Sequence, residues 1–413
     1  MKGRKMADNK ESSHLFDGLL FPKIFQAFRM AIQPSKLTIG LLAVAAVCAA
    51  GWIMDQVTLT AAGSQGESGV FSTLWHSMAV GFHSAVCSLL LFDLSGASAS
   101  ITECYQTVAG TVREHYVYSI VFFAITFVVM CIAGGAICRI AALQFARGEK
   151  PGLTEAVSFS MKRFLSLFAA PLTPVGIIIF VGIFIFVLGL LGNIPRVGEL
   201  LIGIFMPLTL LAGGFIAIIV IGAVAGLNLM FPAVAYDDAD CFDAISRSLS
   251  YVYARPWRMG FYTIIAAIYG AICYLFVRFF TFVLLWASHW ALQLGLFGDN
   301  SKLKIIWPVP TFGGLRGGAA LAAGNWTESV AVFLMQLFVL IMVGLVVSFI
   351  ISFYFSVNTI IYALMRNRVD NTAFDDVYTY SDEAEPSLSE PEAKEEQKPS
   401  EPPTEPDPSS PTE

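Results

Sequence analysis

The chain has 413 residues, of which 56% are hydrophobic and 14% are charged, and its formal net charge is −6. Soluble domains carry about a quarter charged residues, so this composition excludes an ordinary soluble protein and predicts an integral membrane protein. The stretch from Asp370 to Glu413 holds fourteen Asp/Glu and two Lys, and its richness in Pro, Glu and Ser predicts a disordered acidic cytoplasmic tail over 370–413. No basic cluster interleaved with aromatic residues occurs, which argues against nucleic acid as a partner.

The N-terminal region, 1–36, is basic and precedes the first long apolar run. It lacks a convincing cleavage site, so we expect that run to be a retained first helix. The stretch Leu15–Ile32 mixes apolar residues with Asp17, Lys23 and Arg29. This pattern predicts a cytoplasmic, interfacial amphipathic helix that lies on the membrane surface.

Six apolar runs reach the length of about 20 residues that a helix needs to cross a bilayer. They predict an all-α transmembrane domain over 37–369. The sixth run is too long for one crossing, so it must tilt or project into water. Gly213, Gly214 and the Gly222/Gly226 pair suit close helix contact. The six runs are Leu37–Met54, Tyr116–Leu143, Leu172–Leu191, Leu200–Met230, Phe261–Trp286 and Val330–Met365.

Charge distribution predicts the orientation of these spans. With six crossings and an inner N-terminus, nineteen Lys and Arg lie on the inner side and five on the outer side. By the positive-inside rule, both termini then face the cytoplasm of a bacterial inner membrane. The outer side has two long loops, 55–115 and 287–328. Gly69–Phe92 is apolar but holds four Ser, one Thr and two His, and we expect it to lie outside, in or against the membrane.

Two stretches that lie 88 residues apart predict an internal repeat. The same shift lays the second span over the fourth and the third over the fifth, giving two tandem parallel units over about 116–191 and 200–286. Each unit is a span, a short amphipathic helix along the inner membrane surface, and a span. Thr154 and Asp240 are suitable N-cap residues for these short helices. The aligned acid, alanine and serine are Glu155, Ala156 and Ser160 in the first copy, and Asp243, Ala244 and Ser248 in the second.

This pattern resembles a broad group of uncharacterised bacterial multi-pass membrane proteins. The group includes the membrane domain that accompanies some glycerophosphoryl diester phosphodiesterases. The ending Thr359–Tyr378 is similar to endings in such proteins as well. The resemblance implies the helical membrane architecture and no particular activity. The residues that carry it are Asp238, Asp243, Ala244, Ile245 and Ser248, with a weaker copy at Glu149, Glu155, Ala156, Val157 and Ser160.

Four histidines are expected on the outer side, and a metal or haem site there would need the two outer loops to converge. The alternative is that imidazole, like other rings with one polar edge, suits a membrane interface. These candidates are His76, His83, His115 and His289. Cys87 and Cys104 are the two outer cysteines, and they can form a disulfide if that compartment is oxidising.

Charged residues offer two further candidates. Arg278 lies inside an expected span, where a charge is costly and often functional, although it can also snorkel outward or pair structurally. The acidic cluster Asp237, Asp238, Asp240 and Asp243 can hold a divalent cation or cap the following helix.

No catalytic motif is present, and we expect no cofactor. The sequence favours a non-enzymatic integral membrane protein, a scaffold or accessory subunit for a partner complex or lipid process. Its expected partners are membrane lipids and either another membrane protein or a second copy of the chain. A passive transporter or channel for a small solute or lipid is the alternative, and a lipid-modifying membrane enzyme is the third hypothesis.

Overall fold

The computed structural model describes residues 20–62, 69–195, 197–295, 303, 306–315 and 325–379. Within these ranges the chain is helical and has no β-strand, which confirms the all-α fold class. The described residues up to Val377 belong to one compact unit. Residues 370–379 of the predicted tail are described, and the rest of it lies outside the described residues.

Six of the described helices are long and apolar enough to cross a membrane, and each contains one of the six predicted runs. This is the architecture of a multi-pass membrane protein. α9 and α11 have 40 residues each and α13 has 44, so all three exceed the roughly 30 Å of a hydrocarbon core. The six are α3 (Pro34–Ala62), α6 (Tyr116–Ala146), α8 (Phe164–Leu191), α9 (Gly198–Asp237), α11 (Pro256–Gly295) and α13 (Trp326–Val369).

Between α3 and α6 the chain forms a helical hairpin of α4 (Val70–Leu90) and α5 (Leu94–Glu114). Neither helix is among the six candidates for crossing a membrane. The carboxylate of Asp55 in α3 accepts hydrogen bonds from two backbone N–H groups at the start of α4. Because these N–H groups have no partner within the helix, Asp55 fixes where α4 begins.

The described part of the N-terminal stretch that was expected on a membrane surface packs one of its faces against the rest of the protein. It forms η1 (Phe21–Phe25) and α2 (Gln26–Ala31), which lie against α11 and α13. Ile24 is fully buried, and Ser352 of α13 donates a hydrogen bond to the carbonyl oxygen of Ala31. Periodicity indicates which face is apolar, but it does not indicate whether lipid or protein covers that face.

The two short helices of the predicted repeat are α7 (Leu153–Lys162) and α10 (Cys241–Ala254). Their first residues lie 88 positions apart, and so do their N-cap residues, Gly152 and Asp240, which have nearly the same extended backbone conformation. Gly152 therefore takes the N-cap position that we had expected for Thr154. The Asp240 side chain makes no capping hydrogen bond.

The aligned alanines and serines are fully buried in both short helices. Ala156, Ala244, Ser160 and Ser248 each have no exposed surface. The Ser160 hydroxyl donates to the carbonyl oxygen of Ile132 in α6, at 2.7 Å. The Ser248 hydroxyl instead donates within α10, to the carbonyl oxygen of Ala244. Small side chains at these positions allow each short helix to pack closely on the preceding span.

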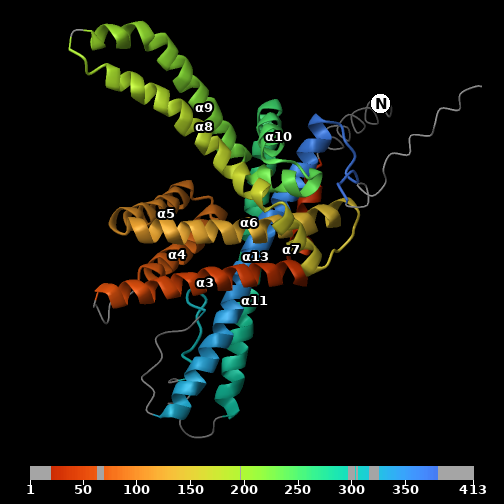
Figure 1. The fold of residues 1–413 in the computed structure, drawn as a ribbon. Helices are drawn as coiled ribbons and strands as arrows, with labels where there is room; N and C mark the ends of the chain where they lie inside the picture. The colour runs from red at the N-terminus through yellow and green to blue at the C-terminus, as the bar shows by residue number, and fades with distance from the viewer. Residues whose placement is uncertain are drawn as a thin grey trace, which may run out of the picture. The chain divides into compact units, whose positions relative to one another are not determined.

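The spans that follow the two short helices pack differently. α8 lies beside α9, whereas α11 lies beside α13 (Figure 1). α6 also packs against α8, but their counterparts α9 and α11 do not pack extensively against each other in the described part of the chain. α10 has 14 residues and α7 has 10. The short helix of the second unit is therefore about one turn longer than that of the first. Beyond the short helices, the 88-residue offset between the two predicted units no longer holds, because α8 begins at Phe164 and α11 at Pro256.

The core lies where the C-terminal halves of α6, α9 and α13 meet α2 and α10. By contrast, the paired helices α8 and α9 expose large apolar side chains over most of their length, including Phe180 and Phe184. The neighbourhoods of Gly213 and Gly214 are open, so these glycines do not provide the close helix contact that we expected. Gly222 does provide one, but its neighbour is Leu249 of α10 and not another span.

Candidate functional site

The acidic cluster of the sequence lies in the short connection between α9 and α10. Asp237 is the last residue of α9, and Asp238 follows it in a left-handed conformation with a φ of 55°. Such a residue ends a helix and reverses the chain, because it cannot continue the right-handed spiral. α10 then begins three residues after Asp238, at Cys241, with Asp240 at its N-cap.

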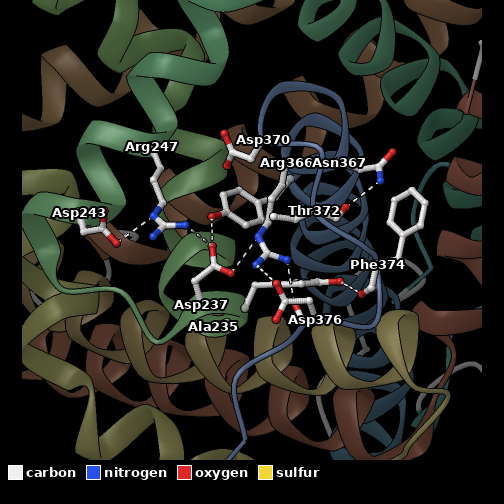
Figure 2. A network of polar contacts seen from close by, with 12 residues as sticks. Ala235, Asp237, Asp243, Arg247, Arg366, Asn367, Asp370, Thr372, Phe374 and Asp376 are labelled. Atoms are coloured by element: carbon white, nitrogen blue, oxygen red, sulfur yellow. Dashed lines mark hydrogen bonds and ion pairs between the residues drawn. The ribbon is translucent and has the colours of Figure 1, made fainter.

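Asp237 is the centre of a network that joins α9, α10 and α13 (Figure 2). Its carboxylate lies 3.2 Å from Nη1 of Arg247 in α10 and 3.1 Å from Nε of Arg366 in α13. The hydroxyl of Tyr362, one turn earlier in α13, donates a hydrogen bond to the same carboxylate. The Asp237 side chain is only 7% exposed. A buried carboxylate needs such partners, because it has lost its hydration.

Two further carboxylates balance the two arginines. Asp243 lies 2.8 Å from Nε of Arg247, one turn away on α10. Asp376, beyond the end of α13, lies 2.9 Å from Nη2 of Arg366. The group therefore has one excess negative charge: Asp237, Asp243 and Asp376 carry three negative charges, and Arg247 and Arg366 carry two positive ones. Asp243 and Asp376 are the exposed carboxylates of the group.

Asp238 connects the two units of the predicted repeat. Both of its carboxylate oxygens accept hydrogen bonds from Arg163, the residue that follows α7. This two-point contact between a guanidinium and a carboxylate fixes orientation as well as distance. Asp240 lies 3.8 Å from the same guanidinium but is largely exposed, so its contribution to stability is small.

The chain beyond α13 folds back onto this network. Tyr251 of α10 donates to Asp370, and Tyr236 of α9 donates to the carbonyl oxygen of Phe374. The Lys23 ammonium lies 3.5 Å from the centre of the Phe374 ring. Val377 is almost fully buried. The part of this ending that follows α13 is thus bound to the rest of the protein. It is held by residues of α9 and α10 and by Lys23 of the N-terminal arm, which consists of η1 and α2.

Two groups of the network have pKa values above their usual range. Burial lowers the pKa of the Arg247 guanidinium, but Asp237 and Asp243 raise it by more, so the pKa of Arg247 lies above its usual value. Burial and the hydrogen bond to Asp370 raise the pKa of the Tyr251 hydroxyl. Neither of these two groups changes its charge near pH 7.

The alternative of a divalent cation at these aspartates has no support from the geometry. Guanidinium groups occupy the carboxylates of Asp237, Asp238 and Asp243. Over the part of the chain that the structure describes, no three His, Cys, Asp or Glu side chains are grouped as a metal site requires.

The four outer histidines are not brought together. His83 in α4 lies 3.8 Å from the Cys87 sulfur and 3.4 Å from the Tyr274 hydroxyl of α11. His289 contacts the carbonyl oxygen of Trp307 at 3.2 Å. His115 separates α5 from α6, and His76 is exposed on α4. Each of these side chains has its own surroundings, so the structure does not assemble the metal or haem site that we considered.

Arg278 does not snorkel into open solvent. Its guanidinium donates to the carbonyl oxygens of Phe312 and Gly313 and to the Tyr274 hydroxyl, at 2.9 to 3.2 Å. It therefore pairs structurally, and it holds the segment 306–315 against α11. This is one of the two structural explanations that the sequence allowed.

Both Cys87 and Cys104 are free thiols in the structure. The register of the α4–α5 hairpin explains why. Ser84 faces Ser100, with their hydroxyl oxygens 3.1 Å apart, and Cys104 lies opposite Gly81. Because Cys87 and Gly81 are six residues apart on α4, the two sulfurs are separated by about 9 Å along the hairpin, which is too far for a disulfide.

Two buried cations were not recognised from the sequence. Lys36, at the start of α3, is fully buried, and its ammonium lies 2.9 Å from the side-chain oxygen of Gln144 and 3.4 Å from the Ser356 hydroxyl. Arg139 of α6 is also buried and donates to the carbonyl oxygen of Ala235. Each stands near the end of an apolar run, where a charge usually reaches water, and only the packing of α3, α6, α9 and α13 buries them.

Comparison with protein-family models, curated proteins and solved structures finds no match to this chain.

Proposed function

We propose that this protein is a non-enzymatic scaffold or accessory subunit of a bacterial inner membrane, with both termini in the cytoplasm. The observation that carries the proposal is the pairing of Asp237 with Arg247 and Arg366. The acidic cluster around Asp237 would be the best candidate for metal or acid–base chemistry, but its ion pairs join three helices instead. Its charged groups lie at the ends of α9 and α13, on the side where the basic residues are concentrated.

Exposed apolar surface supports a role in assembly. α8 and α9 pack against each other but leave large side chains uncovered, among them Ile183, Phe184 and Leu211. Lipid can cover such a surface, and so can another membrane helix. The acidic ending adds a second means of attracting a partner, because it concentrates negative charge next to a bound and ordered segment.

The test is the composition of the protein as purified from its native membrane in mild detergent. We expect a complex of fixed stoichiometry, either with a second copy or with one other membrane protein, by light scattering and mass spectrometry. Changing both Phe180 and Phe184 of α8 to Ser should dissociate it, whereas Trp257→Ser should not. Trp257 is 89% exposed and lies at the start of α11, away from that pair.

A protein that remains a single chain before and after these substitutions would contradict the proposal. So would turnover of a membrane lipid by the purified chain that persists in the Phe180/Phe184 double variant.

A further inference from the structure

A cavity lies between α9 and α11, which do not pack extensively against each other in the described part of the chain. In the first unit the corresponding spans, α6 and α8, touch. In the second unit, α4 and α13 line the space that α9 and α11 leave between them, and the cavity has a volume of about 320 Å³. That volume is at the lower end of the range for small-molecule sites in proteins.

The lining of this cavity is apolar and contains no charged side chain. Phe349 and Phe353 of α13 form one wall, and Phe82 and Val86 of α4 close one end. On α11 the wall consists mostly of small residues, including Ala266 and Gly270. An apolar cavity of this size excludes water and favours a hydrocarbon occupant.

The cavity has one polar end. Asn358 of α13 lines it and is only 5% exposed. Asn228 of α9 lines it too, and its side-chain oxygen accepts a hydrogen bond from the hydroxyl of Tyr354. Two amides at the end of an apolar cavity therefore match a ligand with a neutral polar group next to its chain.

The polar end of the cavity lies in the apolar part of the spans, on the side nearer the charged network. Asn228 precedes Asp237 by nine residues, which is about 14 Å along α9. The charged network marks the polar side, so the amides lie below it, towards the hydrocarbon. Ala267 of α11 lines the cavity and is exposed on the surface of the protein. A chain can therefore enter sideways from the bilayer, without passing through water.

We propose that the cavity between α9 and α11 binds one acyl chain of a membrane glycerophospholipid, with the amides of Asn228 and Asn358 facing the ester that joins the chain to glycerol. The absence of charged residues from the lining disfavours a free carboxylate or a phosphate inside the cavity. The charged headgroup stays outside, nearer the arginine–aspartate network. This binding does not depend on whether the protein is a scaffold.

The test uses the full chain in vesicles of phosphatidylethanolamine and phosphatidylglycerol that contain a phospholipid with a diazirine in one acyl chain. After illumination, mass mapping should place adducts on the parts of α11 and α13 that line the cavity. Excess unlabelled phospholipid should compete for these adducts but not for adducts on α8. Competition is measured on the unchanged protein, so it does not depend on any variant folding.

Two variants and one control make the assignment specific. Ala267→Phe fills the opening and should reduce the cavity adducts by about tenfold or more. Asn358→Leu keeps the approximate size but removes hydrogen-bonding capacity, and the loss of one hydrogen bond should reduce them by up to about tenfold. Ala287→Phe, also at an exposed alanine of α11, should leave them unchanged.

Three results would overturn the proposal. The first is equal labelling of the cavity in the Ala267→Phe and Ala287→Phe proteins. The second is cavity labelling that unlabelled phospholipid does not reduce. The third is labelling by a diazirine fatty acid with a free carboxylate in preference to the phospholipid, which would assign the site to a different ligand.

Discussion

Arg366 near the end of α13 and Asp237 at the end of α9 form a buried ion pair, with Nε of the arginine 3.1 Å from Oδ1 of the aspartate. Their side chains are 9% and 7% exposed. Water hydrates neither group well, so each depends on its remaining partners: Asp376 for the arginine, and Arg247 and Tyr362 for the aspartate. The pair connects α9 with α13, two spans that are far apart in the sequence.

Removing one charge of this pair should destabilise the protein strongly. We expect Asp237→Asn to lower the free energy of unfolding by about 3–5 kcal/mol, because it leaves the buried guanidinium of Arg366 and the partly exposed guanidinium of Arg247 without their shared carboxylate. Asp240→Asn is the matched control at an exposed aspartate and should cost less than about 1 kcal/mol. Denaturant unfolding in mild detergent measures both, and equal effects of the two substitutions would contradict the network.

The two short helices should respond alike to an enlarged alanine. Ala156→Leu and Ala244→Leu each insert a larger side chain where no surface is exposed, so each should destabilise the protein by about 1–3 kcal/mol. Ser158→Leu and Ser246→Leu, at exposed positions of the same helices, should have little effect. A large loss at only one of the two alanines, measured by thermal unfolding, would argue against equivalent copies.

His83 should make stability depend on pH. Burial, and then the nearby Arg278, lower the pKa of its imidazole in the folded protein. Below the ordinary pKa of about 6.5, the unfolded chain therefore binds more protons at this position than the folded chain does. The contribution of His83 to stability is thus unaffected above that pH and falls as the pH drops through it towards the lower folded value.

This effect can be measured by comparing unfolding at pH 7.5 and 5.5. The groups that contact the imidazole are Cys87 and Tyr274, with Arg278 hydrogen-bonded to that tyrosine. His83→Gln should reduce the loss of stability at the lower pH, whereas His76→Gln, at an exposed histidine of the same helix, should not. A steeper pH dependence in the His83 variant would reverse the assigned sign.

The N-terminal arm should be part of the folding unit. Ile24 is fully buried against α11 and α13, so Ile24→Ser removes apolar burial and places a hydroxyl there without a designed partner. We expect a loss of roughly 2–4 kcal/mol. Arg29→Ser on the exposed side of α2 should change little. If both variants unfold like the unchanged protein, the arm is not packed in the membrane-embedded protein.

The orientation can be tested with a membrane-impermeant thiol reagent. Cysteine introduced at Ser301, in the predicted outer loop, should react from outside intact cells, and cysteine introduced at Ser389, in the predicted tail, should not. The reason is the excess of basic residues on the inner side. Reactivity of the second position alone would reverse the proposed topology.

Several features followed from the sequence because they depend on neighbouring residues. Long apolar runs locate the six helices, since a run of that length can only be hydrated at great cost or covered by lipid or protein. The shift of 88 residues relates α7 to α10, because the same small and polar residues recur at helical spacing, although the N-cap of α7 is Gly152 and not Thr154. Ala156, Ala244, Ser160 and Ser248 are buried in both copies, as a shared packing role requires.

Only the tertiary structure decided which groups meet. The sequence marked Asp237 and Asp238 as an acidic cluster, but their partners Arg163 and Arg366 come from other helices. It likewise marked the apolar stripe around Ile24, but not that α11 and α13 cover it. The physical reason is that composition and periodicity indicate whether a side chain prefers to contact water or to be buried away from it. They do not report which distant segment excludes the water, because that depends on how whole helices pack against one another.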